Sequence, residues 1–365
     1  MNKFAFILHY IDLNLLYQDF FWLRKIPPRV LKRFIWHLSP YRYMQIGPIN
    51  SISGASVIGI GIVCPLLPEH FVTVDANTVL TKIVKSVKIG EVFGARIVGL
   101  GGFNSIFGNE GEEVARQVNI AVTSGNTYTA GLAIQGILRA AQLMERDLNT
   151  CRLAIIGATG DIGSICTRML SKQVGEIILV ARRENRLADL AAEIQRSTSV
   201  LVKISQHVNE AVKGADLILN VASAITTIIE PRSLKPGAII CDVAYPAGII
   251  RDIWKYRDDV LAFEGGMATW VRHSEIPLDK HKKRLERFNP PGTIHGCLAE
   301  TILLALEGRY ANYSIGRWKI TEQRVQEMIQ IAGKHGFTLA PFHCGSIRYS
   351  LDDIRRIRKQ AVLTI

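Results

Sequence analysis

"RLAIIGATGDIGSICTRML", residues 152–170, runs from an apolar stretch through three evenly spaced glycines into a helical pattern. Glycine allows a tight turn and lets backbone N–H groups come close to a pyrophosphate, which a helix N-terminus favours electrostatically. The stretch therefore predicts a dinucleotide site at a strand–turn–helix junction. The predicted cofactor contacts are Gly157, Thr159, Gly160, Asp161, Ile162 and Gly163, together with Ala222 after a later strand.

The glycine spacing is G-x-x-G-x-x-G, which differs from the dinucleotide fingerprint G-x-G-x-x-G. Taken alone, the turn is also compatible with a βα connection that binds no ligand. Its surroundings favour the dinucleotide, because a strand pattern precedes the turn, a helical pattern follows it, and a second strand pattern begins soon after.

Continuous apolar runs recur on both sides of this turn, with helical patterns between them. They lie at 152–158, 176–182, 200–205, 216–222, 238–244 and 260–266. Parallel strands buried on both faces have this pattern. We therefore predict an α/β protein with a Rossmann-type parallel sheet over residues 146–268.

The second strand of that sheet ends in "VARRENR", with Arg182 and Arg183 where NAD-binding folds place an acid for the ribose 2′-hydroxyl. Two guanidinium groups suit a 2′-phosphate. The predicted cofactor is therefore NADPH. The alternative is that the arginines only end the strand in solvent.

The rest of the chain divides around the Rossmann-type domain. Residues 1–145 are predicted to form an N-terminal α/β domain for substrate or carrier, with a connecting helix at 129–146. Residues 269–365 are predicted to be mainly helical, with helices at 297–307 and 321–335. A chain of 365 residues is long enough for two or three such domains.

The net charge of +12, from 44 Lys and Arg against 32 Asp and Glu, is unevenly distributed. Residues 21–43 hold six basic residues, no acid, and several aromatics. The segment is interpreted either as a solvated basic face or as a docking surface for an acidic carrier protein or a peripheral membrane contact. No nucleic-acid-binding motif accompanies it, so nucleic acid is excluded as a partner.

Six scattered cysteines show no C-x-x-C pair and no spacing typical of a metal site, so we predict no metal and a reducing, cytoplasmic location. The N-terminus, although rich in aromatics, is interrupted by charge and predicts neither a signal peptide nor a membrane span.

Five segments in series carry a family resemblance: "GLGGFNSIFGN" (99–109), "TSGNTYTA" (123–130), "IIGATGDIGS" (155–164), "VAYP" (243–246) and "CLAETILLALEGRYANYSIGR" (297–317). From about residue 50 onward the chain resembles the long-chain acyl-[acyl-carrier-protein] reductases of cyanobacteria. The resemblance implies NADPH-dependent reduction of a fatty acyl thioester to fatty aldehyde through an acyl-cysteine at Cys297. It implies acyl carrier protein or acyl-CoA as the substrate's carrier, and an aldehyde-consuming enzyme as a further partner.

The residue chemistry agrees with that role for Cys297. A thiolate attacks thioesters readily, and an acyl-cysteine stays electrophilic enough to accept hydride. Because an apolar helix follows Cys297, we expect the helix N-terminus to lower its pKa. The alternative is a buried structural cysteine. His295, where the family is apolar, and Lys82, a candidate to polarise the carbonyl, receive no role from the sequence.

The substrate cleft is predicted to involve Gly101 and Gly102 in a turn of backbone amides and Asn126 and Thr127 between the domains. Here Tyr128 replaces the acid of the G-x-N-T-D motif of shikimate-type dehydrogenases. This replacement weakens the first alternative function, an NADP-dependent shikimate- or amino-acid-type dehydrogenase with direct hydride transfer. A second alternative is a non-catalytic NADPH-binding protein, favoured if Cys297 lies away from the cofactor site.

Overall fold

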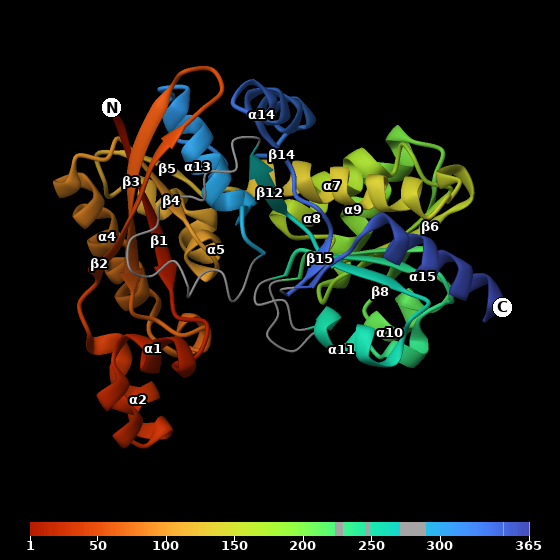
Figure 1. Ribbon diagram of the computed structural model, residues 1–365, viewed down its shortest axis with the longest axis horizontal. Helices are drawn as coiled ribbons and strands as arrows, with labels where there is room; N and C mark the ends of the chain where they lie inside the picture. The colour runs from red at the N-terminus through yellow and green to blue at the C-terminus, as the bar shows by residue number, and fades with distance from the viewer. Residues whose placement is uncertain (223–228, 245–248, 271–289, 346, 365) are drawn as a thin grey trace.

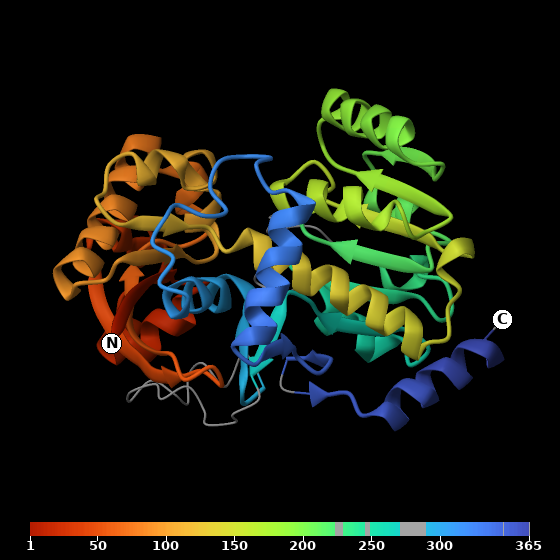
Figure 2. The ribbon, with the colours of Figure 1, turned by 90° about the horizontal axis from the view of Figure 1, so that it is seen from above.

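The computed structural model describes residues 1–222, 229–244, 249–270, 290–345 and 347–364. The chain forms two largely parallel sheets, one in each half of the molecule, and helix α7 (Asn126–Leu143) runs from the centre along the second sheet, as Figures 1 and 2 show. Residues 245 and 246 of the "VAYP" segment lie outside the described residues.

The N-terminal sheet has the strand order β2-β3-β1-β4-β5 and is parallel except for β2. Its strands are β1 (Asn2–His9), β2 (Tyr41–Asn50), β3 (Ser56–Cys64), β4 (Ile97–Leu100) and β5 (Ala121–Thr123). Helix α4 (Ala76–Phe93) covers one face, and helix α13 (Gly296–Leu306) covers the other. In β1, Phe4 and Phe6 pack on the α13 side, whereas Ala5 and Ile7 pack on the α4 side. No strand was predicted at the position of β1.

Short elements connect the strands of this sheet. Between β1 and β2 lie α1 (Leu13–Asp19), the 3₁₀ turn η1 (Phe21–Lys25), α2 (Pro28–Phe34) and η2 (Ile35–His37). They project from the body of the molecule at the lower left of Figure 1. The remaining helices of this half are α3 (His70–Thr73), α5 (Phe103–Glu110) and α6 (Glu112–Ala115).

The second sheet is the predicted Rossmann-type sheet, and each of the six apolar runs contains one of its strands. These are β6 (Arg152–Ile156), β7 (Glu176–Val180), β8 (Leu201–Ser205), β9 (Leu217–Asn220), β10 (Ile239–Asp242) and β11 (Leu261–Glu264). All pair in parallel, in the order β11-β10-β9-β6-β7-β8. The order reverses between β9 and β6, and ligands of such folds bind beyond the carboxyl ends of the strands at this point. The α/β fold class is confirmed.

Helices flank this sheet, and small antiparallel pairings complete the molecule. The helices around the sheet are α8 (Asp161–Leu170), α9 (Glu184–Ser197), α10 (Val208–Val212) and α11 (Ile249–Tyr256), with the 3₁₀ turns η3 (Leu148–Thr150) and η4 (Pro231–Ser233). The other elements are β12 (Met267–Trp270), β13 (Thr293–His295), α14 (Glu322–Lys334), β14 (Phe337–Leu339), β15 (His343–Cys344), β16 (Ile347–Arg348) and α15 (Leu351–Leu363). Helices α13 and α14 confirm the two predicted C-terminal helices. None of the described helices has the length and apolar content of a membrane span.

Candidate functional site

A cavity of about 610 Å³ is lined by residues of both halves of the molecule. It brings together most of the predicted site residues: Gly101, Gly102, Asn126, Gly157, Thr159, Gly160, Asp161, Ile162, Arg182, Arg183, Ala222 and Cys297. Of the other predicted residues, Gly163 and Thr127 lie behind its wall. The glycine turn and the cysteine, 134 to 140 residues apart in sequence, therefore share one cavity.

The glycine turn approaches neighbouring backbone so closely that side chains would not fit. Gly157 has φ +85°, and a Cβ on it would lie 2.9 Å from the backbone of Ala222 at the end of β9. A Cβ on Gly163 would lie 2.2 Å from the carbonyl oxygen of Gly157, so this glycine allows α8 to pack on the turn. Gly160 precedes the first residue of α8, and the start of that helix lines the cavity. This arrangement fits a dinucleotide pyrophosphate at a helix N-terminus.

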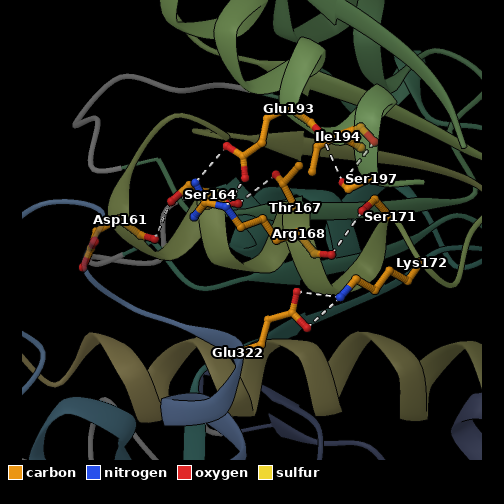
Figure 3. A network of polar contacts seen from close by, with 11 residues as sticks. Asp161, Ser164, Thr167, Arg168, Ser171, Lys172, Glu193, Ile194, Ser197 and Glu322 are labelled. Carbon is orange, nitrogen blue, oxygen red and sulfur yellow. Dashed lines mark hydrogen bonds and ion pairs between the residues drawn. The ribbon is translucent and has the colours of Figure 1, made fainter. Parts of the chain in front are cut away.

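Helix α8 is fixed by contacts on both sides, as Figure 3 shows. Arg168 makes two hydrogen bonds, of 2.6 and 3.1 Å, to the Glu193 carboxylate of α9. Lys172 bonds the Glu322 carboxylate of α14 at 2.7 Å. These ties hold the C-terminal end of α8, at Arg168, and the residues just after it, at Lys172.

Asp161, at the start of α8, is buried and bridges to the other half of the molecule. Its carboxylate accepts hydrogen bonds from the Asn126 side-chain amide at 3.0 Å and from the Trp318 backbone N–H at 2.9 Å. Burial raises the pKa of this carboxyl despite those two donors. The sequence predicts Asn126 as a substrate contact, but in the structure its amide nitrogen donates a hydrogen bond to Asp161.

Three arginines line the cavity beside the β7–α9 connection. Arg182 and Arg183 are exposed, and within the described part of the chain neither has an acidic partner. The third, Arg186, lies 4.2 Å from the ring of Trp318, whose indole N–H donates to the Thr159 carbonyl at 3.1 Å. The sequence analysis did not predict Arg186 or Trp318. Arg186 could have been predicted from the sequence, because this residue ends the same "VARRENR" stretch.

Cys297 is the second residue of α13, and its side chain is partly exposed to the cavity, whereas the other five cysteines are buried. The expected helix start is present, but the expected lowering of the pKa is wrong. Removal from water raises the pKa of the Cys297 thiol to about 12, and the nearby Glu300 carboxylate adds to this rise. The backbone N–H groups of Leu298 and Gly102 act in the opposite direction. Desolvation therefore outweighs the helix start.

The turn that contains Gly102 is held by a histidine that the sequence analysis did not predict. His9, at the end of β1, accepts a hydrogen bond at Nε2 from the Phe103 backbone N–H at 3.1 Å. Its Nδ1–H donates to the Tyr10 carbonyl at 2.9 Å. Burial lowers the pKa of His9 to about 4, so the ring is neutral and can make both bonds. His9 thus fixes the turn that presents Gly102 to the cysteine.

The other side of Cys297 is formed by the segment before α7. Gly125 has φ +78°, and a Cβ on it would lie 2.2 Å from the Cys297 Cα. The buried Glu300 carboxylate accepts from the Thr123 hydroxyl and, at 2.7 Å, from the Tyr128 backbone N–H. Thr127, behind the cavity wall, bonds the Ser314 hydroxyl at 2.5 Å. The two Glu300 contacts tie α13 to β5 and α7 and so fix the position of the thiol.

The two residues without an assigned role differ in position. His295 precedes α13 and lines the cavity, and burial lowers its pKa to about 4. Lys82, on α4, does not line the cavity, and its ammonium donates to the Leu38 carbonyl instead. Lys82 therefore does not have the geometry to polarise a substrate carbonyl in the cavity.

Apolar side chains make up the part of the cavity near the N-terminal sheet. They are Phe6, Leu8, Met44, Ile46, Trp270, Ile294 and Leu298. The polar glycine turn, the cysteine and this apolar wall together give a space that fits a dinucleotide on one side and an aliphatic chain on the other.

Comparisons with known proteins agree with the dinucleotide side of this site. Residues 139–261 match the Shikimate / quinate 5-dehydrogenase family model. The chain is 30% identical over 313 residues to the long-chain acyl-[acyl-carrier-protein] reductase of Synechococcus elongatus, covering 83% of this chain and 88% of that protein. It is also 30% identical over 314 residues to aminotransferase PigE of a Serratia species, covering 85% of this chain but only 36% of that protein.

Among solved structures, the chain is similar to L-tryptophan dehydrogenase from Nostoc punctiforme, with TM-score 0.40 and 14% identity over 100% of this chain and 88% of that one. It is also similar to shikimate 5-dehydrogenase from Listeria monocytogenes, with TM-score 0.34 and 12% identity over 70% of this chain and 83% of that one. The match to the acyl-[acyl-carrier-protein] reductase and the family-model match confirm the predictions of an oxidoreductase and of a nicotinamide cofactor.

Proposed function

Because this chain belongs to the family of the long-chain acyl-[acyl-carrier-protein] reductase, we propose that it reduces a long-chain fatty acyl thioester to a fatty aldehyde with NADPH. One observation carries the proposal: the partly exposed Cys297 and the glycine turn at Gly157 line the same cavity. A non-catalytic dinucleotide-binding protein would not need a thiol at that position.

The residues at the glycine turn fit the cofactor. The backbone amides at the start of α8 would hold the pyrophosphate, and Arg182 and Arg183 would hold the 2′-phosphate. Arg186 and Trp318 would bound the adenosine side of the site. When bound, NADPH supplies a hydride, and with it two electrons, to the carbonyl carbon of the acyl group.

The chain's own residues carry the remaining steps. The Cys297 sulfur attacks the thioester carbonyl, the bond to the carrier sulfur breaks, and the carrier thiol leaves with the proton from Cys297. After reduction of the acyl-cysteine, the Gly102 N–H stabilises the negative oxygen of the thiohemiacetal. Its C–S bond then breaks, the aldehyde leaves, and Cys297 regains its proton from solvent.

The raised pKa of Cys297 suits this order of events. A thiol that stays protonated in the empty cavity resists oxidation. Its proton has to leave, and passes to the departing carrier sulfur, as the Cys297 sulfur forms its bond to the carbonyl carbon. Glu300 positions the helix and disfavours premature thiolate formation. We propose acyl carrier protein or coenzyme A as the carrier, and an aldehyde-consuming enzyme as the next partner.

Intact-mass measurement tests the proposal. Wild-type protein incubated with a long-chain acyl thioester and no NADPH is expected to gain one acyl mass, which is lost when NADPH is added. Cys297→Ser should gain no mass and form no aldehyde, yet bind NADPH nearly as wild type does. Cys151→Ser is the matched control, because Cys151 is buried and does not line the cavity, and it should still be acylated.

The family match over residues 139–261 favours one other function, a shikimate- or amino-acid-type dehydrogenase. In that case hydride passes directly to or from a hydroxy- or amino-acid carbon. Tyr128 occupies the position of that family's acid, and its side chain is buried in the core. Turnover of such substrates by Cys297→Ser, with no acyl adduct on the wild type, would replace the thioester proposal with this function.

A further inference from the structure

The segment between β1 and β2 forms a small projecting lobe, residues 21–38, which we call the basic lobe (Figure 1). Its inward side chains, Leu23, Leu31 and Ile35, are buried in one hydrophobic cluster with Leu16 and Val63. The lobe is therefore a packed structure that holds its outward side chains in fixed places.

The outward face of the basic lobe carries large apolar side chains in solvent. Phe21 is 71% exposed, Trp22 62% and Phe34 56%, and Val30 and Leu38 are exposed as well. Exposed apolar side chains gathered on one small surface mark an interaction site. Tryptophan and phenylalanine beside basic residues are typical of surfaces that lie in the headgroup region of a bilayer.

The exposed side chains of the basic lobe are also strongly basic. Arg24, Lys25, Arg29, Lys32 and Arg33 are all exposed, and the sequence has no Asp or Glu from residue 20 to residue 43. In the part of the chain that the structure describes, one ion pair reaches the lobe, Lys32 with Glu69 at 2.8 Å. The remaining positive charge is complementary to an anionic surface, since each basic residue near anionic lipid adds to binding.

We propose that the basic lobe seats this protein on an anionic bilayer surface, with Phe21, Trp22 and Phe34 in the headgroup region. The lobe projects from the molecule and none of its residues lines the cavity, so its apolar side chains meet a flat surface rather than enclose a ligand. An acidic protein would also match the charges, but tryptophan and phenylalanine interleaved with basic residues favour the headgroup region of an anionic bilayer.

The strands on each side of the lobe connect it to the apolar part of the cavity. Leu8 at the end of β1 and Met44 and Ile46 on β2 line that part. The two strands that flank the basic lobe in the chain therefore also carry part of the apolar cavity wall. A bilayer bound at the lobe would lie next to the ends of these two strands. This step rests on the proposed function, since it concerns the supply or release of an aliphatic chain. Docking itself does not.

Vesicle binding of the full chain tests the docking. The protein should sediment with vesicles of phosphatidylcholine mixed with phosphatidylglycerol. Its binding to vesicles of phosphatidylcholine alone should be weaker by about tenfold or more. Added salt should weaken the binding because exposed charges are screened over about 10 Å at 0.1 M. Vesicles with brominated acyl chains should quench tryptophan fluorescence in the wild type and much less in Trp22→Phe.

Two sets of variants complete the experiment. Arg29→Glu/Arg33→Glu and Phe21→Ser/Trp22→Ser should each lower vesicle binding about tenfold or more, with NADPH binding unchanged. Lys85→Glu/Lys88→Glu is the matched control, because it makes the same charge change on the exposed side of α4 and should leave vesicle binding intact.

Two outcomes would overturn docking on a bilayer. One is vesicle binding by the lobe variants equal to that of the wild type. The other is a lobe variant that still binds vesicles but loses affinity for a purified acidic acyl carrier protein, which would assign the surface to that protein. Neither outcome bears on acylation of Cys297, so this proposal and the proposed function fail separately.

Discussion

At Cys297 the sequence predicts the right residue at the right end of a helix, but not its electrostatics. Helical spacing could have placed Glu300 beside it, three residues along the same helix. Packing against β5 and α7 buries the Glu300 carboxylate and removes water from the Cys297 thiol. Those contacts join segments more than 170 residues apart in the chain, so no local pattern contains them.

The raised pKa of Cys297 predicts how the thiol reacts in the free protein. Because the thiolate is the nucleophile and the pKa is about 12, alkylation by iodoacetamide should accelerate roughly tenfold per pH unit from pH 7 to pH 10. Mass spectrometry of the labelled Cys297 peptide measures the rate, with Cys297→Ser as the blank. A rate that levels off below pH 9 would mean that the helix N-terminus and the Gly102 amide dominate after all.

At the level of elements, the Rossmann-type strands were predictable because each lies in a mainly apolar run, and five of the six are largely buried. The expected burial on both faces is wrong for β8, an edge strand in which no residue is buried. Strand β1 also lies in a mainly apolar run, but its aromatic residues at the start of the chain did not suggest a strand between β3 and β4. Trp318 was not predictable either. It has φ +61°, which is uncommon for a residue with a side chain, and it contacts the glycine turn only through the tertiary fold.

The β7–α9 connection makes the choice of cofactor testable. Arg182→Ala/Arg183→Ala should weaken NADPH binding at least tenfold more than NADH binding, because a charge-assisted hydrogen bond is worth about 1.5–3 kcal/mol and only NADPH carries the 2′-phosphate. Titration of both cofactors by fluorescence measures the two losses. Arg196→Ala, an exposed arginine near the far end of α9, is the control. Equal losses for the two cofactors would show that these arginines do not contact the phosphate.

At the scale of the whole molecule, the candidate site depends on how α7, which packs on the Rossmann-type sheet, meets α13, which packs on the N-terminal sheet. Helix α13 follows the Rossmann-type domain in sequence but packs on the N-terminal sheet, where Ala299 and Ile302 meet Phe4 and Phe6. The sequence contains no signal for this return of the chain. The domain boundaries at 145/146 and 268/269 therefore stay a prediction, although the fold class that they describe is confirmed.

The shared cavity gives a last prediction, which concerns the length of the acyl chain. Met44 and Ile46 are buried on β2 and line the apolar part of the cavity, so a larger side chain there should shorten the space for an aliphatic chain. Each methylene that no longer fits costs about 1–3 kcal/mol. Ile46→Trp should therefore lower kcat/KM for a hexadecanoyl thioester at least tenfold relative to an octanoyl thioester.

Aldehyde formation from the two thioesters measures this ratio, and unchanged NADPH binding shows that the variant is folded. Met44→Phe is a second test at a neighbouring position of the cavity wall. It adds less volume than Ile46→Trp and is therefore less prone to disrupt the fold by overpacking. It should shift the ratio in the same direction by less. Val92→Trp is the matched control, since Val92 is 91% exposed on α4 and outside the cavity. If Ile46→Trp and Met44→Phe both kept the wild-type ratio, as Val92→Trp should, the aliphatic chain would have to lie elsewhere. The polar half of the cavity would then hold the cofactor without the apolar half holding the substrate.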